Sequence, residues 1–595
     1  MGRTLTFQHG WQRSLHTSAV VALLFTIACA PSGPAPAKPT EAAKAAPAAT
    51  TAPAAKPTEA AAKPGADATK PAADAAKPAA TTAPAVAKTG EQPRSGGELQ
   101  FVVSAEPPTF DAHRETTFAM IHPTAPHYSL LIRFDPEKYP QVAPDLAESW
   151  EISPDNLTYT FKLRDGVKFH DGSPLTSRDV KASYDKILNP PEGVVSIRKA
   201  QYAAVESVAA PDPRTIVFNL KYPSAAMLSL IASPWNFIYS ADKLAADPKW
   251  YEKNVMGSGP FKFVEYVSGS HWVGQKNPDY FVKGQPYLDG FRATFIRETA
   301  AQVAAIRGER AQVEFRGFTP PARDDLVRAL GDKITVQESP WVLALIVVFN
   351  TEKKPFDDPR VRRALSLALD RWGGSDALSK ITFVKPVGAF VRPGSPFARP
   401  ETELIKMPGF SRDPNAAKEE AKRLLREAGV PDGFAFTLKN RDVPQPYEPT
   451  GVFVIDQWRK IGLNVTQVAQ ETNAYDTDKR TGNFEVSIDF LSDYLDEPDI
   501  QLSKFISASR SPANYGRYND PELDQLYDQQ SRETDPQKRN ALVWKFEDRA
   551  IGEMAYTYPI IWWQRIIPHS SRLKGYEVLP SHYVNQDLAD VWLTE

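Results

Sequence analysis

The stretch from Ala143 to Val180 constrains the fold more than any other part of the chain, because strong local signals follow one another along it. Thr158 to Leu163 alternates polar and apolar side chains as a half-buried strand does. Asp165-Gly166 predicts a hairpin turn that returns along Val167 to Phe169. Thr176 predicts the cap of a helix just beyond it. The stretch therefore predicts a β-hairpin followed by a helix.

As one string, this stretch resembles the signature of the family 5 bacterial extracellular solute-binding proteins, the oligopeptide- and dipeptide-binding components of ABC importers. The family pattern runs P-x-L-A-x-S-W, continues as T-Y-T-F-x-L-R-x-G-V-x-F-H-D-G-x-P and ends on D-V. The matching residues, in order, are Pro144, Leu146, Ala147, Ser149, Trp150, Thr158, Phe161, Leu163, Arg164, Gly166, Val167, Phe169, His170, Asp171, Gly172, Pro174, Asp179 and Val180. So many matches in one order make the resemblance specific.

The resemblance covers roughly residues 95 to 595. Gly96 to Val103 matches the family's first strand, and Val255 to Phe261 matches its G-T-G-P-Y/F element. Phe349 to Arg371 resembles a family segment with the core P-F-D-D-x-R-V-R-x-A-L, in which Asp358 can cap a helix. We expect the arginines after this cap to lie on the solvated side of the helix: Arg360, Arg362 and Arg363.

The second half of the chain predicts an α/β fold. Ile334 to Asn350 predicts a strand pair rich in β-branched residues, and Asp413 caps a predicted helix. Residues 434–468 read strand, helix, strand, which is a βαβ unit and requires parallel strands. Two more helices are predicted to open at Asp520-Pro521 and Asp535-Pro536.

The family fold implies two lobes joined by two chain crossings that close on a ligand, a class II periplasmic-binding-protein architecture or "Venus flytrap". The resemblance also implies an extra small subdomain in the first lobe. The predicted ranges are residues 1–28 for a signal peptide, 29–94 for a lipidated cysteine and disordered tether, 95–133, 225–345 and 565–595 for lobe I, 134–224 for the small subdomain, and 346–564 for lobe II.

The N-terminal residues predict export and anchoring. Arg3 and Arg13 precede an apolar run from Ala19 to Ile27 that is too short to span a bilayer, as in a signal peptide. The run ends at Cys29 in a context that resembles a lipobox, so lipidation of Cys29 is predicted, with ordinary signal cleavage as the alternative. Residues 30–94 are almost only Ala, Pro, Thr and Lys, which predicts a disordered tether.

Several functional classes are disfavoured. The net charge of −2 gives no basis for nucleic acid binding, and the single cysteine allows no intrachain disulfide or cysteine zinc site. His113, His122 and His127 lack nearby cysteines or paired carboxylates, so we expect no metal and no cofactor. The chain has no H-E-x-x-H motif. Ser258 has Met256 two residues before it and Pro260 two residues after it, where G-x-S-x-G requires glycines, so an enzyme is not expected.

Peptide-binding members of the family hold the ligand's α-ammonium with the aspartate of an A-D-Y-x-x-P segment. Asp493 and Tyr494 match this aspartate and tyrosine, although one extra residue precedes Pro498. A carboxylate shut inside a closed cleft needs a partner cation, which a ligand ammonium would supply. The resemblance therefore implies that Asp493 anchors a ligand amine.

This chain lacks the arginine with which dipeptide-binding family members hold the carboxylate end of a peptide. Dipeptide binders resemble R-P-Y-N-P, whereas this chain has Gln445 where the arginine would be. Arg441 and Arg392 are candidate replacements, because bidentate arginine suits a carboxylate. This departure argues against a strict dipeptide specialist and leaves longer peptides or a non-peptide amine such as an opine.

Three functions stay open. The leading prediction is a monomeric, lipid-anchored receptor, in the periplasm or on the outer face of the cell membrane, that captures peptides by lobe closure and delivers them to an ABC permease. The second keeps the fold but binds an oligosaccharide, opine or metal chelate, with Trp341 or another indole as a stacking surface. The third and most remote is a secreted hydrolase, because scattered carboxylates still allow a glycosidase.

Overall fold

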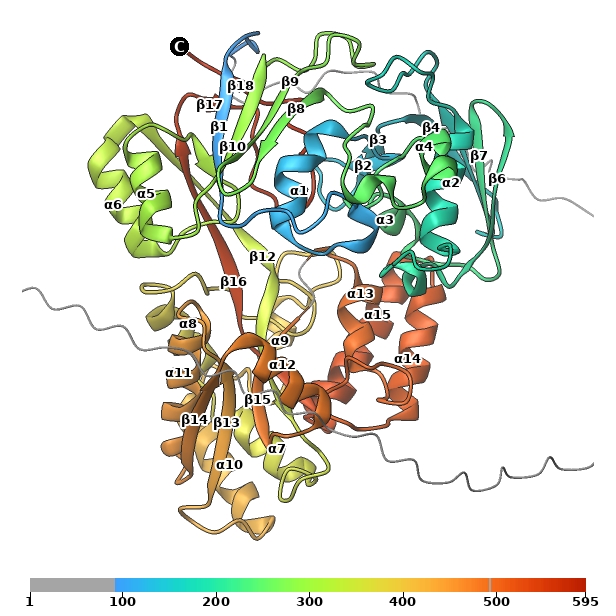
Figure 1. Ribbon diagram of the computed structural model, residues 1–595. Coiled ribbons are helices and arrows are strands. Elements are labelled where there is room, and N and C mark those ends of the chain that lie inside the picture. The colour runs from blue at the N-terminus through green and yellow to red at the C-terminus, as the bar shows by residue number, and fades with distance from the viewer. Residues whose placement is uncertain (1–90, 492–493) are drawn as a thin grey trace, which may run out of the picture. The chain divides into compact units, whose positions relative to one another are not determined.

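Three main β-sheets organise residues 91–491 and 494–595, the part of the chain that the computed structural model describes (Figure 1). These residues belong to one compact unit. No helix within them combines the length and apolar composition that a membrane span requires. Short two-residue or three-residue strands complete the sheet structure: β2 Ile132–Phe134, β3 Val142–Pro144, β17 Leu573–Lys574 and β18 Trp592–Leu593.

The first sheet has five strands in the order β11-β1-β10-β9-β8. Its central strand β1 pairs in parallel with both β10 and β11, and β8 and β9 form an antiparallel edge. The bounds are β1 Glu98–Val103, β8 Phe261–Val267, β9 His271–Lys276, β10 Gly290–Phe295 and β11 Val313–Glu314. The predicted first strand is confirmed.

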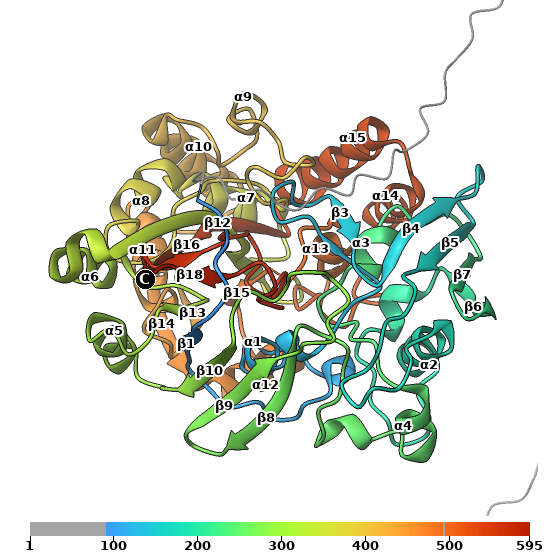
Figure 2. The ribbon, with the colours of Figure 1, turned by 90° about the horizontal axis from the view of Figure 1, so that it is seen from above.

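A four-stranded antiparallel sheet, in the order β4-β5-β7-β6, lies apart from the first, with helix α2 against β6 and β7 (Figure 2). Its bounds are β4 Ala147–Ile152, β5 Thr158–Leu163, β6 Val205–Asp212 and β7 Thr215–Leu220, and α2 spans Ser177–Leu188. All five elements lie within residues 134–224, the range predicted for the small subdomain. Those domain boundaries stay a prediction.

One local prediction in this region is wrong. Strand β5 pairs with β4 and β7, and does not form a hairpin with Val167 to Phe169. The chain does turn at Asp165-Gly166, as predicted, but Val167 to Phe169 leads into a second turn at His170-Asp171-Gly172, where Phe169 N–H donates to the Ser173 carbonyl and Leu175 N–H donates to the Val167 carbonyl. Distant strands outcompete the local turn because each offers a full ladder of hydrogen bonds. The predicted cap is confirmed, since Asp179 accepts a hydrogen bond from the Thr176 backbone at 2.8 Å.

The second five-stranded sheet has the order β14-β13-β15-β12-β16. Strands β13 and β14 run parallel and flank helix α11, which confirms the predicted βαβ unit. The bounds are β12 Ile334–Phe349, β13 Ala435–Arg441, β14 Asn464–Gln470, β15 Val486–Phe490, β16 Thr557–Ser570 and α11 Tyr447–Arg459.

Strands β12 and β16 are the two chain crossings between the lobes. The sequence predicts a strand pair over Ile334 to Asn350, but the structure has one continuous 16-residue strand whose partner is β16. One end of this pair packs into the cores beneath the first sheet through Ile334 and Ile567, and the other enters the core of the second sheet. Figure 1 shows both strands running between these regions.

The remaining helices surround these sheets. Those in the first half are α1 Phe118–Thr124, α3 Met227–Ile231, α4 Ala241–Ala246, α5 Thr299–Arg307 and α6 Pro320–Leu330. Those in the second half are α7 Pro359–Leu367, α8 Arg371–Leu378, α9 Glu401–Leu404, α10 Pro414–Glu427, α12 Thr472–Thr481, α13 Pro498–Leu502, α14 Pro521–Arg532 and α15 Pro536–Glu547. The caps predicted at Asp358, Asp413, Asp520 and Asp535 are confirmed.

The predicted solvated position of Arg362 is wrong, because its side chain is 1% exposed. Its guanidinium donates to the backbone carbonyls of Phe356, Asp357, Met554 and Ala555. These carbonyls lie in the turn before α7 and in the loop before β16. A buried guanidinium with four acceptors meets the requirement that buried polar groups be hydrogen-bonded.

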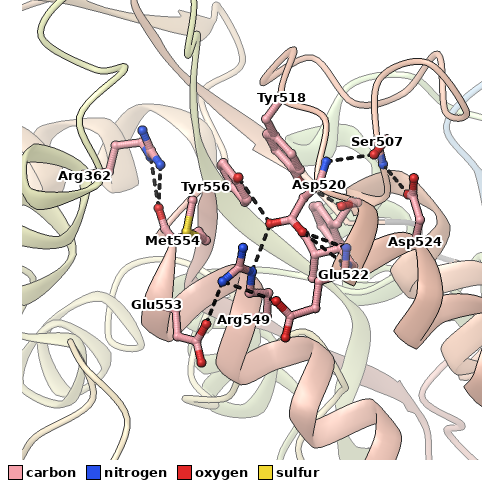
Figure 3. Close-up of polar contacts among 12 residues, drawn as sticks. Arg362, Ser507, Tyr518, Asp520, Glu522, Asp524, Arg549, Glu553, Met554 and Tyr556 are labelled. Atoms are coloured by element: carbon pink, nitrogen blue, oxygen red, sulfur yellow. Dashed lines mark hydrogen bonds and ion pairs between the residues drawn. The ribbon is translucent and has the colours of Figure 1, made fainter.

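The start of α14 is tied to the helical turn that follows α15, Asp548–Glu553, through Asp520 (Figure 3). One oxygen of Asp520 caps α14 by accepting from Glu522 N–H at 3.0 Å, and the other accepts from Arg549 Nε at 3.0 Å and Tyr556 Oη at 3.3 Å. The Asp520 backbone donates to Ser507 at 2.8 Å. One buried carboxylate thus joins three segments of the chain.

Candidate functional site

The sequence-predicted site residues fall into two groups. Cys29 and Asp493 lie outside the described residues, whereas Arg392, Arg441, Gln445, Tyr494 and Trp341 lie within them. Gln445 is exposed at the start of α11. Tyr494 is partly buried, its ring lies 6.0 Å from the Arg198 guanidinium, and its carbonyl accepts a hydrogen bond from Ser581 at 2.8 Å.

Arg392 is occupied by an ion pair with Asp496. Its Nη2 and Nε lie 2.6 Å and 3.0 Å from the same carboxylate oxygen, and the two side chains are 5% and 0% exposed. Burial raises the pKa of the Asp496 carboxyl, and the Arg392 guanidinium opposes that rise. This pairing argues against Arg392 as the partner of a ligand carboxylate and makes it a support for the segment after Tyr494.

That segment also contacts the small subdomain. The Asp496 backbone N–H donates to Tyr139 Oη at 3.2 Å, and Leu495 is fully buried in the core that includes β5 and α2. The Ala225 backbone N–H donates to the Ser531 carbonyl at 2.9 Å, which is a second contact between the two halves of the chain. The residues beside the predicted amine anchor therefore lie where the two lobes meet.

Arg441 ends β13 and has no carboxylate within 4 Å among the described residues. Its Nη1 donates to Tyr447 Oη at 3.0 Å and its Nη2 donates to Thr472 at 3.2 Å. The guanidinium carbon lies 4.9 Å from the Tyr447 ring centroid. These neutral contacts orient the guanidinium and leave its charge without a counter-ion from the described chain.

Trp341 belongs to a group of rings at the two crossings, which we call the crossing cluster: Trp341, Phe383, Tyr447, Trp563 and His582. Trp341 lies edge-on to Trp563 at 5.2 Å and to His582 at 5.3 Å between ring centroids. Phe383 lies 5.2 Å and Tyr447 6.2 Å from Trp563. Both indoles are buried, with 3% and 6% exposure.

A bulge in β12 positions this cluster. Pro340 pairs with Gln564 and Ala344 pairs with Trp562, so three residues of β12 face the single residue Trp563. The Val342 backbone N–H, displaced from the ladder, donates to the Pro580 carbonyl at 3.1 Å. Extra residues in one strand bend it and redirect its side chains. The bulge thereby turns Trp341 toward His582, in the last part of the chain.

The first lobe contributes two further groups. His122 lies beside His582, with its Nε2 3.0 Å from the His582 carbonyl oxygen. Burial lowers the pKa of His122 to about 3 and that of His582 well below its usual value, so both rings are neutral at neutral pH. The Arg316 guanidinium lies 4.1 Å from the Phe118 ring centroid and 5.9 Å from that of Trp341.

The three histidines considered for a metal lie in separate environments. His113 Nε2 donates to the Phe237 carbonyl at 3.0 Å, while His127 donates to the Phe261 carbonyl and accepts from Trp272 Nε1. No group of three His, Cys, Asp or Glu side chains within residues 91–491 and 494–595 is arranged to hold a metal ion. All three are core histidines, because each is fully buried.

Sequence reasoning missed Arg316, Phe383 and His582. They come from three segments that have no shared motif and lie far apart along the chain. No spacing rule connects such residues. Hydrogen bonds between distant segments bring two of them near Trp341: Gln564 N–H donates to the Phe383 carbonyl, and Val342 N–H donates to the carbonyl of Pro580, two residues before His582.

Comparisons with known proteins agree with this architecture. The sequence model of the "Bacterial extracellular solute-binding proteins, family 5 Middle" matches residues 141–512, more than half of the chain. Glutathione-binding protein GsiB of Pectobacterium atrosepticum is 27% identical over 457 residues, which cover 75% of this chain and 85% of that protein. Heme-binding protein A of Haemophilus influenzae is 28% identical over 485 residues, which cover 77% and 85%.

Solved structures have the same fold. The binding protein DppA from Helicobacter pylori, in complex with the peptide STSA, aligns with a TM-score of 0.69 at 26% identity and covers 84% of this chain and 99% of that one. The ABC transporter substrate-binding protein CtaP from Listeria monocytogenes aligns with a TM-score of 0.73 at 24% identity, covering 84% and 100%. This chain therefore belongs to the family 5 bacterial extracellular solute-binding proteins, the substrate-binding components of ABC importers, and has their two-lobe class II fold.

Proposed function

We propose that this protein captures peptides outside the cytoplasm and delivers them to the permease of an ABC importer. The observation that carries the proposal is the crossing cluster, in which Trp341 and Trp563 of the two crossings meet His582 and Phe383 from either side. Aromatic surfaces accept varied side chains, as a peptide receptor requires. The resemblance to H. pylori DppA, solved with a bound peptide, supports a peptide as the ligand.

The proposed mechanism is lobe closure. A ligand held against the crossing cluster contacts both lobes, so its binding free energy favours the state in which they approach each other. Tyr494 and Arg441 approach this junction from the second lobe, and Asp493 is proposed to hold the ligand's ammonium. Trp341 supplies an apolar wall, while exposed Gln445 is placed to contact a longer ligand.

The protein is further proposed to act as a monomer without catalysis, held at the membrane by a lipid on Cys29. Family members are extracytoplasmic, which supports a ligand-binding part on the outer side of the membrane. Several acyl chains on one cysteine anchor stably, because each buried CH₂ contributes about 0.8 kcal/mol. Metabolic labelling with a fatty acid, compared between wild type and Cys29→Ala, tests the anchor.

A non-peptide solute is the second candidate. A relative that is 28% identical is named a heme-binding protein, and flat molecules suit a wall of indole rings. The absence of an arginine at Gln445 also removes the family's contact for a dipeptide carboxylate.

Native mass spectrometry of the purified protein separates the two candidates, since tightly held ligands stay bound and their masses identify them. Calorimetry with the identified peptide then tests Asp493→Ala, which should weaken binding by about 3–5 kcal/mol, or two to four decades in Kd. Asp242→Asn, in an exposed ion pair of the first lobe, is the matched control. Unchanged affinity in Asp493→Ala would rule out the amine anchor, and a retained non-peptide mass would rule out the peptide.

A further inference from the structure

Buried nitrogen atoms without acceptors gather around the crossing cluster. Five buried side-chain nitrogens in this region have no hydrogen-bond partner among the described residues. They are Nε of Arg316 and Arg441, Nε1 of Trp341 and Trp563, and Nε2 of His582. A buried polar atom without a partner costs about 1–3 kcal/mol. Several such atoms in one place indicate that their partners come from a bound molecule.

All five atoms are donors. The indole and guanidinium nitrogens can only donate. The tautomer of His582 follows from its neighbour: His122 Nε2 must carry a proton to donate to the His582 carbonyl at 3.0 Å. The same proton faces His582 Nδ1 at 3.2 Å, so Nδ1 accepts. A neutral His582 therefore carries its own proton on Nε2. The bound molecule must supply acceptors and no donors at these positions.

Three other arginines face carboxylates, and the buried Arg362 donates its Nε to backbone carbonyls, whereas the Nε of Arg316 and that of Arg441 have no acceptor among the described residues. Arg392, Arg399 and Arg539 each face a buried carboxylate within 3 Å. Within residues 91–491 and 494–595, neither Arg316 nor Arg441 has a carboxylate within 4 Å. A guanidinium that is partly withdrawn from water and has no counter-ion attracts an anionic ligand group.

Glu314 does not neutralise Arg316. Its carboxylate accepts the backbone N–H groups of Arg316 and Gly317, at 3.1 Å and 2.7 Å, and is buried. Burial raises the pKa of Glu314, although the neighbouring guanidinium groups oppose the rise. The Arg316 guanidinium points instead to Phe118 and Trp341.

Ring contacts connect the two arginines. Arg316 lies 5.9 Å from Trp341, Trp341 lies 5.2 Å from Trp563, and Trp563 lies 6.2 Å from Tyr447. Tyr447 in turn lies 4.9 Å from Arg441. A series of ring contacts therefore connects two cations, one contributed by the first lobe and one by the second.

We propose that the solute carries two anionic groups, bound by Arg316 and Arg441, with its middle part against Trp341 and Trp563. Carboxylates fit best, because each accepts both a guanidinium fork and an indole or imidazole N–H. The inference rests on the proposed function and narrows it to acidic peptides or related dicarboxylates. It also makes Arg316 a specificity-determining residue, because an acid bridging both cations ties the lobes together.

Four probes test the proposal by calorimetry on the full chain: tripeptides with one glutamate, the same tripeptides as C-terminal amides, matched glutamine tripeptide amides, and linear dicarboxylates of graded length. Each peptide of the first set carries two carboxylates, each peptide of the second set carries one, and those of the third set carry none. We expect the two-carboxylate peptides to bind about 30-fold more tightly than either amide set. Arg316→Gln and Arg441→Gln should each abolish this preference, and Arg316→Lys should retain part of it.

Arg328→Gln, on an exposed arginine of the first lobe, is the matched control and should keep the preference. Circular dichroism checks that each variant is folded. Equal affinity for acidic and neutral peptides overturns the inference and keeps the proposed peptide function. If the dicarboxylates bind and none of the peptides does, the inference of two anionic groups is supported and the proposed peptide function is overturned. Failure of every two-carboxylate probe to bind the wild type overturns the inference.

Discussion

Replacing Arg392 with methionine tests whether its ion pair with Asp496 supports the junction between the lobes. Methionine keeps an apolar stem in place of the arginine stem but has no charge. The Asp496 side chain is 0% exposed, so water cannot replace the guanidinium that lies 2.6 Å away. Among the described residues, the remaining side-chain contact of Asp496 is Gln501 Nε2 at 3.4 Å, which is too long for a strong hydrogen bond.

The expected loss is large. Removing one partner of a buried pair leaves an uncompensated charge and costs about 3–5 kcal/mol. The double variant Arg392→Met/Asp496→Leu removes both charges and should recover most of that loss, because apolar pairs often replace buried ion pairs without penalty.

The loss should depend on pH with a definite sign. Burial already raises the pKa of Asp496, and removal of Arg392 raises it further. A carboxyl whose pKa is higher in the folded state destabilises the protein above that pKa and costs nothing below the unfolded value of about 3.9. The deficit of Arg392→Met should therefore shrink as the pH falls from 7 toward 4.

Urea unfolding followed by tryptophan fluorescence, at pH 7 and at pH 5, measures these differences. Arg412→Met is the control, because Arg412 and Glu401 form an ion pair whose side chains are 55% and 56% exposed. Such pairs contribute about 0–1 kcal/mol. A loss below about 1 kcal/mol at pH 7 in Arg392→Met, or a deficit that grows as the pH falls, would refute the reasoning.

Three further predictions concern stability. Asp520→Ala should lower the free energy of unfolding by about 2–4 kcal/mol in urea titrations, because it removes a helix cap and leaves Arg549 without its buried partner, whereas Asp520→Asn should lose less. Gly257→Ala should cost at least about 1–3 kcal/mol in the same assay, because its Cβ would lie 2.1 Å from a backbone carbonyl oxygen; Gly552→Ala, where the nearest atom is 3.7 Å away, should be tolerated. Burial lowers the pKa of His127 to about 3, so below about pH 6.5 the unfolded state binds a proton that the folded state does not, and the protein loses stability as the pH falls. His127→Gln removes this proton, so its free energy of unfolding should fall between pH 6 and pH 4 with a slope about 1.4 kcal/mol per pH unit smaller than that of the wild type.

Much of the fold could be predicted from the sequence, for reasons that lie within short stretches. Asp358-Pro359 and Asp520-Pro521 start helices because a side-chain oxygen accepts a backbone N–H two residues later. Residues 434–468 form a βαβ unit because their hydrophobic period changes from two to 3.6 and back. These signals do not depend on what lies elsewhere in the molecule.

Predictions failed where distant segments decided the outcome. Val167 to Phe169 did not pair with β5, because β4 and β7 offered longer ladders. Arg362 lies in the core because loops from two distant parts of the chain turn four carbonyls toward it. The role of Arg392 as the partner of a ligand carboxylate stays a prediction, which its ion pair with Asp496 disfavours.

The amino-acid sequence by itself determined the family, the two-lobe architecture and most helix starts, since caps, turns and the signature depend on neighbouring residues. Only the tertiary structure decided which side chains surround the junction. Arg316 follows β11 and Arg441 ends β13, and only tertiary packing connects them through the rings of Trp341, Trp563 and Tyr447. Whether an arginine has a counter-ion depends on which distant segments pack against it, and no local pattern records that.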